Sequence, residues 1–426
     1  MTDQLKTLHC RRALEALRNG VPNRYAVEML GCGQPVITER FEAILGRVAD
    51  SELAQRSSAS NSLLVSGDFG SGKSHLLTHL EHLALEQGFV CSKVAISKET
   101  PLYDLGKVFK SAVEHGRLPG RSGMLIEELG QSLNPDTVEY DRFFSWANDT
   151  EHNGLNAIFP ATLQIYKWSH DFELNRQIEY FWAGDKIMSA RVKEGLRQIN
   201  MHRDYTFRAP KVSELPPQRL LFFNNLIRAA GYKGWVVLLD EIELMGSYSL
   251  LQRGRSYAEL TRWCGQEQGD AYPGLVTVGS VTDDFAAVVI DVAGDKQDRD
   301  YVEGKLQERN AHLVGSAVTG MDMLERGTVG LRQPGDAEVQ GTLDRLRDIY
   351  STAYGWDAPG LSLKDMASGG FQNRMRYKVR ASINQWDLMR HYPDQTFHTE
   401  GDEFHHTYDE NRDLEKESKD DGAAAA

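Results

Sequence analysis

The sequence predicts an α/β protein whose core is a parallel β-sheet, and three observations lead to this prediction. Short apolar runs, typical of buried strands, alternate with segments in which apolar residues recur at helical spacing. One of these runs ends in a glycine-rich loop, and a later one ends in neighbouring acidic residues. A long stretch of mostly helical pattern lies between those two runs.

Four apolar runs predict the strands of this sheet. They are rich in Val, Leu and Ile, as is typical of strands that are buried on both faces. The predicted strands are residues 61–67, 89–97, 235–244 and 274–281. Because parallel strands need crossover connections that are usually helical, the alternation of runs and helical segments favours a parallel arrangement.

Helical patterns fill most of the remaining chain. Gly20 and Pro22 separate the first two predicted helices, whereas Gly88 and Gly231 end two later ones. The predicted helical segments are residues 6–18, 37–50, 73–87, most of 98–233 and 335–392. The stretch 98–215 contains many aromatic residues, which we interpret as the core of an inserted helical element, with base stacking as the alternative.

The overall composition indicates a cytoplasmic globular protein. The 426 residues are 41% hydrophobic and carry a net charge of −13. No apolar run is long enough to span a membrane, and the first residues lack the apolar core of a secretory signal. The four cysteines have neither CxxC nor zinc-site spacing, as expected in a reducing compartment. The negative charge argues against indiscriminate nucleic-acid coating but leaves room for a local basic patch.

The segment GDFGSGKS matches the phosphate-loop pattern GxxxxGK[ST] in full, and it predicts a P-loop NTPase. Glycines let backbone N–H groups surround phosphate oxygens, and the helix that follows directs its N-terminus toward them. Lys73 is expected to contact the β- and γ-phosphates of ATP, and Ser74 to bind Mg²⁺. The alternative, an accidental turn, is disfavoured by the strand before it and the helix after it. The expected ATP-binding residues of this segment are Gly67, Asp68, Phe69, Gly70, Ser71, Gly72, Lys73, Ser74 and His75.

The acidic end of the third strand predicts the other half of the site. In P-loop NTPases an apolar strand ends in an acid that orders Mg²⁺, and Asp240 fits this role. We expect this strand to lie beside the phosphate loop. Glu241 is positioned to polarise the attacking water. On an extended chain Glu243 would point the same way as Glu241, so we interpret it as a spare carboxylate. The alternative is that all these acids are simply solvated.

The acidic pair also indicates the class of nucleotide-binding protein. The chain has neither an NKxD guanine signature nor an LSGGQ motif, which disfavours a GTPase and a transporter-type ATPase. An Asp-Glu pair after apolar residues resembles the AAA+ ATPases. In that group a polar residue at the tip of the next strand senses the γ-phosphate. Thr282 is the first candidate and Ser280 the second, the alternative for either being a hydroxyl that caps a turn.

AAA+ ATPases also carry a helical lid with an arginine that contacts the γ-phosphate. Arg374, Arg376 and Arg380 are the candidates, and Arg376 and Arg380 share one helix face. The alternative is a solvated or DNA-facing basic stripe. A homo-oligomeric ring would also need an arginine finger in trans. The candidates for that finger are Arg253, Arg255 and Arg262.

Four segments together resemble one protein family. They are residues 11–31, 66–77, 181–186 and 227–243. The family comprises the BrxD ATP-binding proteins of BREX-type phage-defence islands, which are distantly similar to the origin-recognition class of AAA+ ATPases. The resemblance implies ATPase roles for Lys73, Ser74, Asp240 and Glu241, with Arg376 as the lid arginine. It also implies action beside other BREX defence proteins, with double-stranded DNA as a partner.

Two departures from the AAA+ pattern shape the predicted domains. The phosphate loop and the acids are unusually far apart, so a helical insert must separate them. Too few residues follow the lid for a winged helix, so any DNA contact must come from the insert or the lid. The predicted division is a core of residues 1–97 and 216–325, an insert of 98–215, a lid of 326–392 and an acidic, disordered tail of 393–426.

The predicted function is a nucleotide-driven switch or assembly factor in anti-phage defence. Its alternatives are a STAND-type signalling ATPase and a scaffold that binds ATP without turnover. Two smaller clusters have both a functional and a structural interpretation. Lys107, Lys110, Arg117 and Arg121 form either a phosphate-backbone contact or a solvated face. His398, His405 and His406 form either a metal site or an unstructured histidine cluster.

Overall fold

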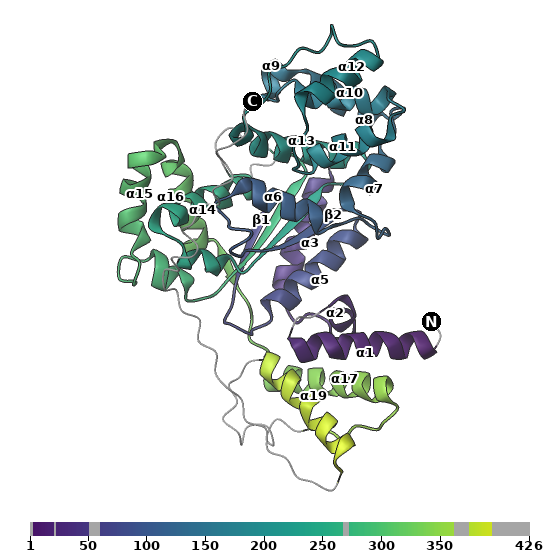
Figure 1. Ribbon diagram of the computed structural model, residues 1–426. Helices are drawn as coiled ribbons and strands as arrows, with labels where there is room; N and C mark the ends of the chain where they lie inside the picture. Colours follow the sequence, from purple (N-terminus) through teal and green to yellow (C-terminus); the bar gives the residue numbers. More distant parts are fainter. Residues whose placement is uncertain (1–2, 21–22, 51–59, 267–271, 362–374, 394–426) are drawn as a thin grey trace.

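A six-stranded sheet lies at the centre of the molecule, in the order β3-β2-β4-β5-β1-β6 (Figure 1). The computed structural model describes all residues except 1–2, 21–22, 51–59, 267–271, 362–374 and 394–426. The strands are β1 Ser62–Ser66, β2 Val90–Ala95, β3 Gly116–Arg117, β4 Trp235–Asp240, β5 Leu275–Val281 and β6 Thr328–Gly330. All neighbouring pairs are parallel except β2 and β3. The prediction of a mostly parallel α/β core is therefore confirmed.

Two expectations about the sheet are wrong. The strand that carries the acids, β4, does not lie beside β1, because β5 pairs with both and separates them. The sheet also has two short strands that we did not predict. The antiparallel β3 extends one edge within the stretch we expected to be helical, and β6 extends the other edge beside β1.

Helices cover both faces of the sheet, and further helices form clusters above and below it. They are α1 Asp3–Asn19, α2 Arg24–Leu30, α3 Pro35–Ala49, α5 Lys73–Glu86, α6 Leu105–Glu114, α7 Leu125–Ser132, α8 Val138–Asn148, α9 Thr150–Asn153, α10 Ile158–Trp168, α11 Phe172–Trp182, α12 Ser189–Gln198, α13 Leu215–Ala229, α14 Leu250–Trp263, α15 Asp298–Arg309, α16 Val314–Arg326, α17 Asp336–Tyr354 and α19 Met375–His391. Asn23 caps α2, a helix that the sequence pattern did not predict, through a side-chain acceptor for the N–H of Ala26.

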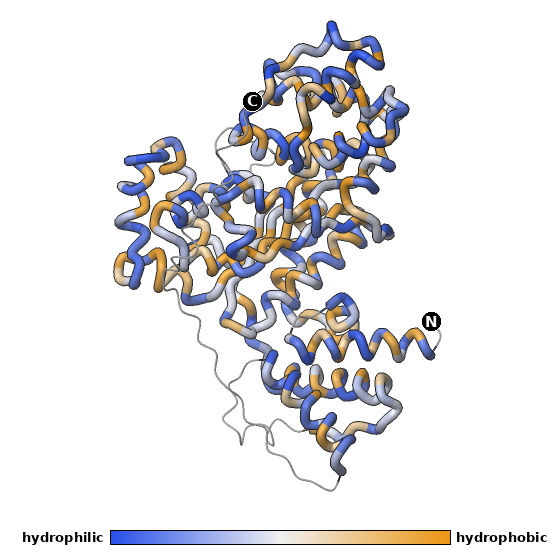
Figure 2. The backbone as a smooth tube through the Cα atoms, viewed as in Figure 1, coloured by the Kyte–Doolittle hydropathy of each residue, from blue (hydrophilic) through white to orange (hydrophobic). Residues whose placement is uncertain are grey.

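Alternating side chains of the strands supply two separate cores. On β1, Leu63 and Val65 pack with α3 and α5, whereas Leu64 packs on the opposite face with α6, α13 and α14. Apolar residues concentrate along the sheet and on the helix sides that face it (Figure 2). Both faces of β4 and β5 are buried, which explains their nearly continuous apolar sequence.

In Figure 1 the helices α8, α9, α10 and α12 lie above α13, with α11 and α7 to its side, and residues of α7, α8, α10, α11 and α12 share one core with α13. Phe222 of α13 contacts Phe143, Phe159 and Trp182, with ring centroids 5.0 to 5.5 Å apart. These aromatic residues are buried, which supports their interpretation as core, although Trp168 is half exposed.

A third apolar cluster is built from both ends of the described chain. Helices α1 and α2 pack against α17 and α19, below the sheet in Figure 1. Leu14 and Leu17 of α1 meet Leu346 and Trp386 in this cluster. In the described part of the chain, no helix has the length and apolar character needed to cross a membrane.

Candidate functional site

The predicted phosphate loop connects β1 to α5. Gly70 and Gly72 have φ of +78° and +106°, a region that glycine adopts readily and other residues rarely do. The second of them directly precedes Lys73, the first residue of α5. The loop therefore turns sharply and aims the helix N-terminus into the space beside it. A helix end in this position favours bound anions.

The ammonium group of Lys73 is held inside its own loop. The side chain is 8% exposed, and Nζ donates hydrogen bonds to the carbonyl oxygens of Gly67 at 2.7 Å and Asp68 at 3.3 Å. The nearest carboxylate oxygen is Oε1 of Glu243, at 3.8 Å from Nζ. The loop lysine is thus next to the acids that follow β4.

Asp240 ends β4 in a network of polar groups. The residue is 5% exposed, and its Oδ1 accepts a hydrogen bond of 2.6 Å from the hydroxyl of Ser280 on β5. Its Oδ2 lies 3.5 Å from Nζ of Lys93, on β2. The same Nζ donates to the carbonyl oxygen of Ser74 at 3.4 Å. Lys93 therefore bridges the two residues predicted to bind Mg²⁺, a role that no sequence motif indicated.

The chain turns abruptly after Asp240, so the expectation of an extended segment is wrong. Glu241 has φ +61° and ψ +38°, the left-handed region, and a 3₁₀ helix follows at Ile242–Ser247. Glu241 is exposed, whereas Glu243 is 4% exposed. Burial raises the pKa of Glu243, Lys73 opposes that shift, and Asp240 and Glu241 add to it.

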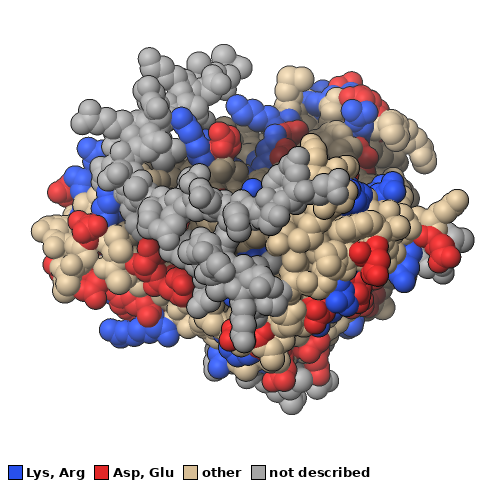
Figure 3. Space-filling model, turned by 90° about the horizontal axis from the view of Figure 1, so that it is seen from below, with Lys and Arg blue, Asp and Glu red and all other residues tan. Residues whose placement is uncertain are grey.

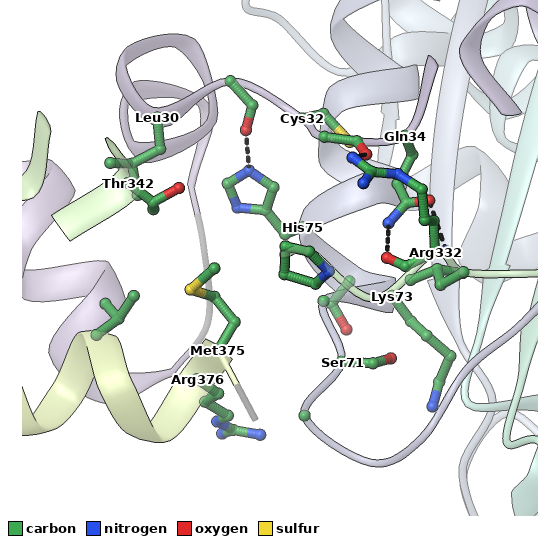
Figure 4. A pocket seen from close by; sticks show the side chains of 18 of the residues that line it. Leu30, Cys32, Gln34, Ser71, Lys73, His75, Arg332, Thr342, Met375 and Arg376 are labelled. Carbon is green, nitrogen blue, oxygen red and sulfur yellow. Dashed lines mark hydrogen bonds between the residues drawn. The ribbon is translucent and has the colours of Figure 1, made fainter. Parts of the chain in front are cut away.

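One cavity of about 500 Å³ brings these groups together with distant parts of the chain. Figure 4 shows Ser71 and Lys73 on one side, Met375 and Arg376 of α19 on the other, and His75 between them. The lining residues include Leu17, Gly20, Leu30–Gln34, Phe69–His75, Asp240, Glu241, Glu243, Leu331, Arg332, Glu338, Thr342, Arg345, Met375, Arg376 and Val379. Its wall therefore combines polar and charged groups of the loop with apolar side chains of the third cluster.

Arg376 reaches the phosphate loop from α19. Its guanidinium carbon lies 5.7 Å from the centroid of the Phe69 ring, and the side chain lies against Gly20. Arg380 is exposed and does not line the cavity. Arg374 lies outside the described residues. Of the described lid candidates, Arg376 is the one that lines the cavity.

Hydrogen bonds between the segment after β6 and the loop before α3 form another side of the cavity. Arg332, after β6, pairs with Glu338 at 2.7 Å and donates to the carbonyl oxygen of Gly33 at 3.1 Å. Gln34 exchanges two hydrogen bonds with the backbone of Arg332, at 2.8 and 2.9 Å. The contacts of Arg332 with Gly33 and Gln34 join segments nearly 300 residues apart, so sequence patterns could not reveal them.

His75 anchors the start of α5 to the end of α2. A ring nitrogen, Nε2, lies 2.8 Å from the carbonyl oxygen of Gly31, and burial lowers the pKa of the imidazole. The neutral ring therefore donates this hydrogen bond. Although His75 lines the cavity, its Nε2 is engaged with the protein itself.

Several predicted residues are not brought into the cavity. Thr282 lines a separate pocket of about 80 Å³ with Ser66 and Glu325. Of the proposed arginine fingers, Arg253 is 2% exposed and pairs with the buried Asp298 at 2.7 Å, which makes it unavailable to a neighbouring subunit. The other two finger candidates have partners within the chain as well, a ring for Arg255 and a carboxylate for Arg262.

The predicted basic residues between 107 and 121, which lie on α6 and directly after it, are also paired internally. The four ion pairs are Lys107–Asp104, Lys110–Asp185, Arg117–Glu81 and Arg121–Glu128. This pairing supports a solvated face rather than a phosphate contact. On the face seen in Figure 3, Lys and Arg are likewise interspersed with Asp and Glu.

The residues that we expected to hold Mg²⁺ have suitable chemistry. Mg²⁺ prefers oxygen ligands and usually takes one or two carboxylates together with phosphate oxygens and water. The Ser74 hydroxyl and the Asp240 carboxylate supply such oxygens. Within the described ranges, no three His, Cys, Asp or Glu side chains form a group that could hold a metal alone. His398, His405 and His406 lie outside the described residues.

A comparison with protein families identifies the chain. The family model for the BREX system ATP-binding protein BrxC/D matches residues 6–124 and 218–384. The chain belongs to the BrxC/D family. The matched segments contain the phosphate loop, the acids after β4 and Arg376, whereas most of the helical insert falls in the gap of the match. No curated protein and no solved structure matches the chain.

Proposed function

We propose that this BrxC/D protein is a P-loop, AAA+-like ATPase whose site is the cavity between the phosphate loop, the acids after β4 and α19. One observation carries the proposal. Lys73, Asp240, Glu241 and Arg376 come from three distant segments and meet at or beside a single cavity. A purely structural role would not require a complete phosphate-loop motif to lie beside two acids and an arginine at the same cavity.

The two sides of the cavity would divide the binding of ATP. The loop amides, the N-terminus of α5 and Lys73 would bind the phosphates. The adenine ring would pack against the apolar side chains of Leu17, Leu30, Met375 and Val379. Lys73 must exchange at least one of its present carbonyl acceptors for a phosphate oxygen.

The acids would perform the hydrolysis. Glu241 would orient and polarise the attacking water, and Arg376 would stabilise charge that develops on the γ-phosphate. Mg²⁺, held through Ser74 and Asp240, would neutralise phosphate charge. Ser280 supports this arrangement because its hydroxyl fixes one oxygen of Asp240 and leaves the other directed toward Lys93.

The proposal includes a division into a core, an insert and a lid. The predicted boundaries assign residues 1–97 and 216–325 to the core, 98–215 to the insert and 326–392 to the lid. The packing of α1 and α2 on α17 and α19 supports assigning these two helices to the lid instead. ATP binding between the lid and the core would then change how the two units fit together.

We also propose the setting in which this switch acts. Other BREX proteins are the expected partners, in the cytoplasm, with double-stranded DNA as a further partner and a homo-oligomer as a further state. Because the cations between residues 107 and 121 are paired, DNA contact would have to use other surfaces of the insert or lid. DNA binding that weakens steeply with added salt would support this part, and binding insensitive to salt would contradict it.

The ATPase proposal is tested by turnover of ATP with wild type and Glu241→Gln. Wild type should release phosphate, alone or with DNA and partner proteins, and Glu241→Gln should bind ATP but release little. Lys73→Ala should lose turnover and keep its melting temperature, whereas a scaffold would lose stability. No turnover by wild type under any of these conditions would refute the enzymatic role.

A further inference from the structure

The candidate site contains more carboxylates than the proposed reaction uses. Asp240 and Glu241 have roles in it, but Glu243 does not. Glu243 nevertheless lines the cavity and is nearly fully buried. Buried carboxylates are costly unless they are paired, so this one needs a physical explanation.

Each oxygen of Glu243 has a different surrounding. Oε1 lies 3.8 Å from the ammonium of Lys73, the one described lysine within ion-pair distance of it. Oε2 is buried and has no hydrogen-bond partner among the described residues. In folded proteins nearly all buried polar atoms are satisfied, and exceptions often face a ligand. One oxygen of the carboxylate thus adjoins the lysine that is proposed to bind phosphate, and the other has no hydrogen-bond partner in the described part of the chain.

Next to Lys73 the local balance of charge is unfavourable to phosphates alone. Asp240, Glu241 and Glu243 provide three negative groups there, and Lys73 and Lys93 provide two positive ones, whereas the arginines of the cavity come from the segments after β6, α17 and α19. A nucleotide without a metal would bring several more negative charges close to Glu243. Because the site is largely buried, solvent screens this repulsion weakly.

We infer that Glu243 makes the site selective for magnesium-bound nucleotide over metal-free nucleotide. The inference rests on the proposed function and adds a positioning residue to it. Without a metal, Glu243 repels the phosphates and retains Lys73 by charge attraction. With Mg²⁺ on the phosphates, the added positive charge offsets the repulsion and Lys73 is released to them.

Binding of a fluorescent ADP, measured with Mg²⁺ and with EDTA, tests the inference without requiring turnover. Wild type should prefer the magnesium form by about tenfold or more, since a single nearby charge is worth more than 1 kcal/mol at low screening. Glu243→Gln should strengthen binding in EDTA about tenfold and change binding with Mg²⁺ less than about threefold. Glu243→Asp, which keeps the charge, should retain most of the preference.

Glu179→Gln is the matched control, because Glu179 is a half-buried carboxylate of α11 that accepts a hydrogen bond from Tyr166 and does not line the cavity. It should behave as wild type. An unchanged metal preference in Glu243→Gln, or weaker binding in both conditions, would overturn the inference alone. Equal binding by wild type with and without metal would also overturn it, even if Glu243→Gln failed to fold. No binding by wild type in either condition would overturn the proposed function as well.

Discussion

Replacing Glu241 by glycine and by alanine tests the sharp turn after β4. Glu241 has φ +61° and ψ +38°. A side chain with a Cβ is destabilised by about 1–2 kcal/mol in this region, whereas glycine is not. At ordinary positions alanine is the more stable of the two by roughly 0.5–1 kcal/mol. Because both variants remove every contact of the carboxylate, their difference isolates the backbone term.

The expected order of stability is therefore reversed from the usual one. After glycine's usual disadvantage is subtracted from the left-handed penalty, Glu241→Gly should be more stable than Glu241→Ala by roughly 0.5–1 kcal/mol, or about 1–2 °C in melting temperature for a chain of this size. Thermal unfolding followed by circular dichroism measures the difference, and both variants should lose ATP turnover. An alanine variant as stable as the glycine variant would refute the left-handed turn, whatever the effect on turnover.

Three further predictions concern groups around the site and in the core. Arg376→Ala should weaken ATP binding about tenfold in a titration without changing the melting temperature, whereas Arg380→Ala should do neither. Asp298→Asn should destabilise the protein by about 3 kcal/mol in urea unfolding, because it leaves a buried guanidinium without its carboxylate, and the exposed Asp300→Asn should be neutral. Burial keeps the pKa of His75 below its usual 6.5, so wild-type stability should fall as the pH drops below that value. The melting temperature of His75→Gln should depend less on pH across the same range, and equal pH dependence would contradict the burial argument.

The long apolar elements could be predicted from the sequence because burial leaves a strong local pattern. The strands β1, β2 and β5 and the leucine-rich α5 were all predicted near their observed bounds, whereas β4 begins as predicted but ends at Asp240 instead of residue 244. The missed elements are short. Strands β3 and β6 contain two and three residues, and α2 has seven between Pro22 and Gly31. Such segments are fixed by their neighbours in space rather than by a periodic pattern of their own.

The proximity of several candidate site residues was predictable from local motifs, and their roles stay predictions. The phosphate loop, Asp240 and Arg376 are all beside the cavity or its acids, as the motifs suggested. The sequence misled where a role depends on geometry beyond the motif. Glu243 was interpreted as a spare carboxylate on the assumption of an extended chain. Lys93 was overlooked because it occupies an ordinary position on β2, with two strands between it and β1.

The two ends of the described chain explain why the cavity exists at all. Its apolar side belongs to the cluster formed by α1, α2, α17 and α19, and its polar side belongs to the sheet and α5. These two units meet through a few polar contacts, such as His75 with Gly31 and Arg332 with Gln34, rather than through one continuous core. A ligand that contacts both units strengthens their association by its own binding energy. Under the proposed function, exchange of that ligand would move one unit against the other.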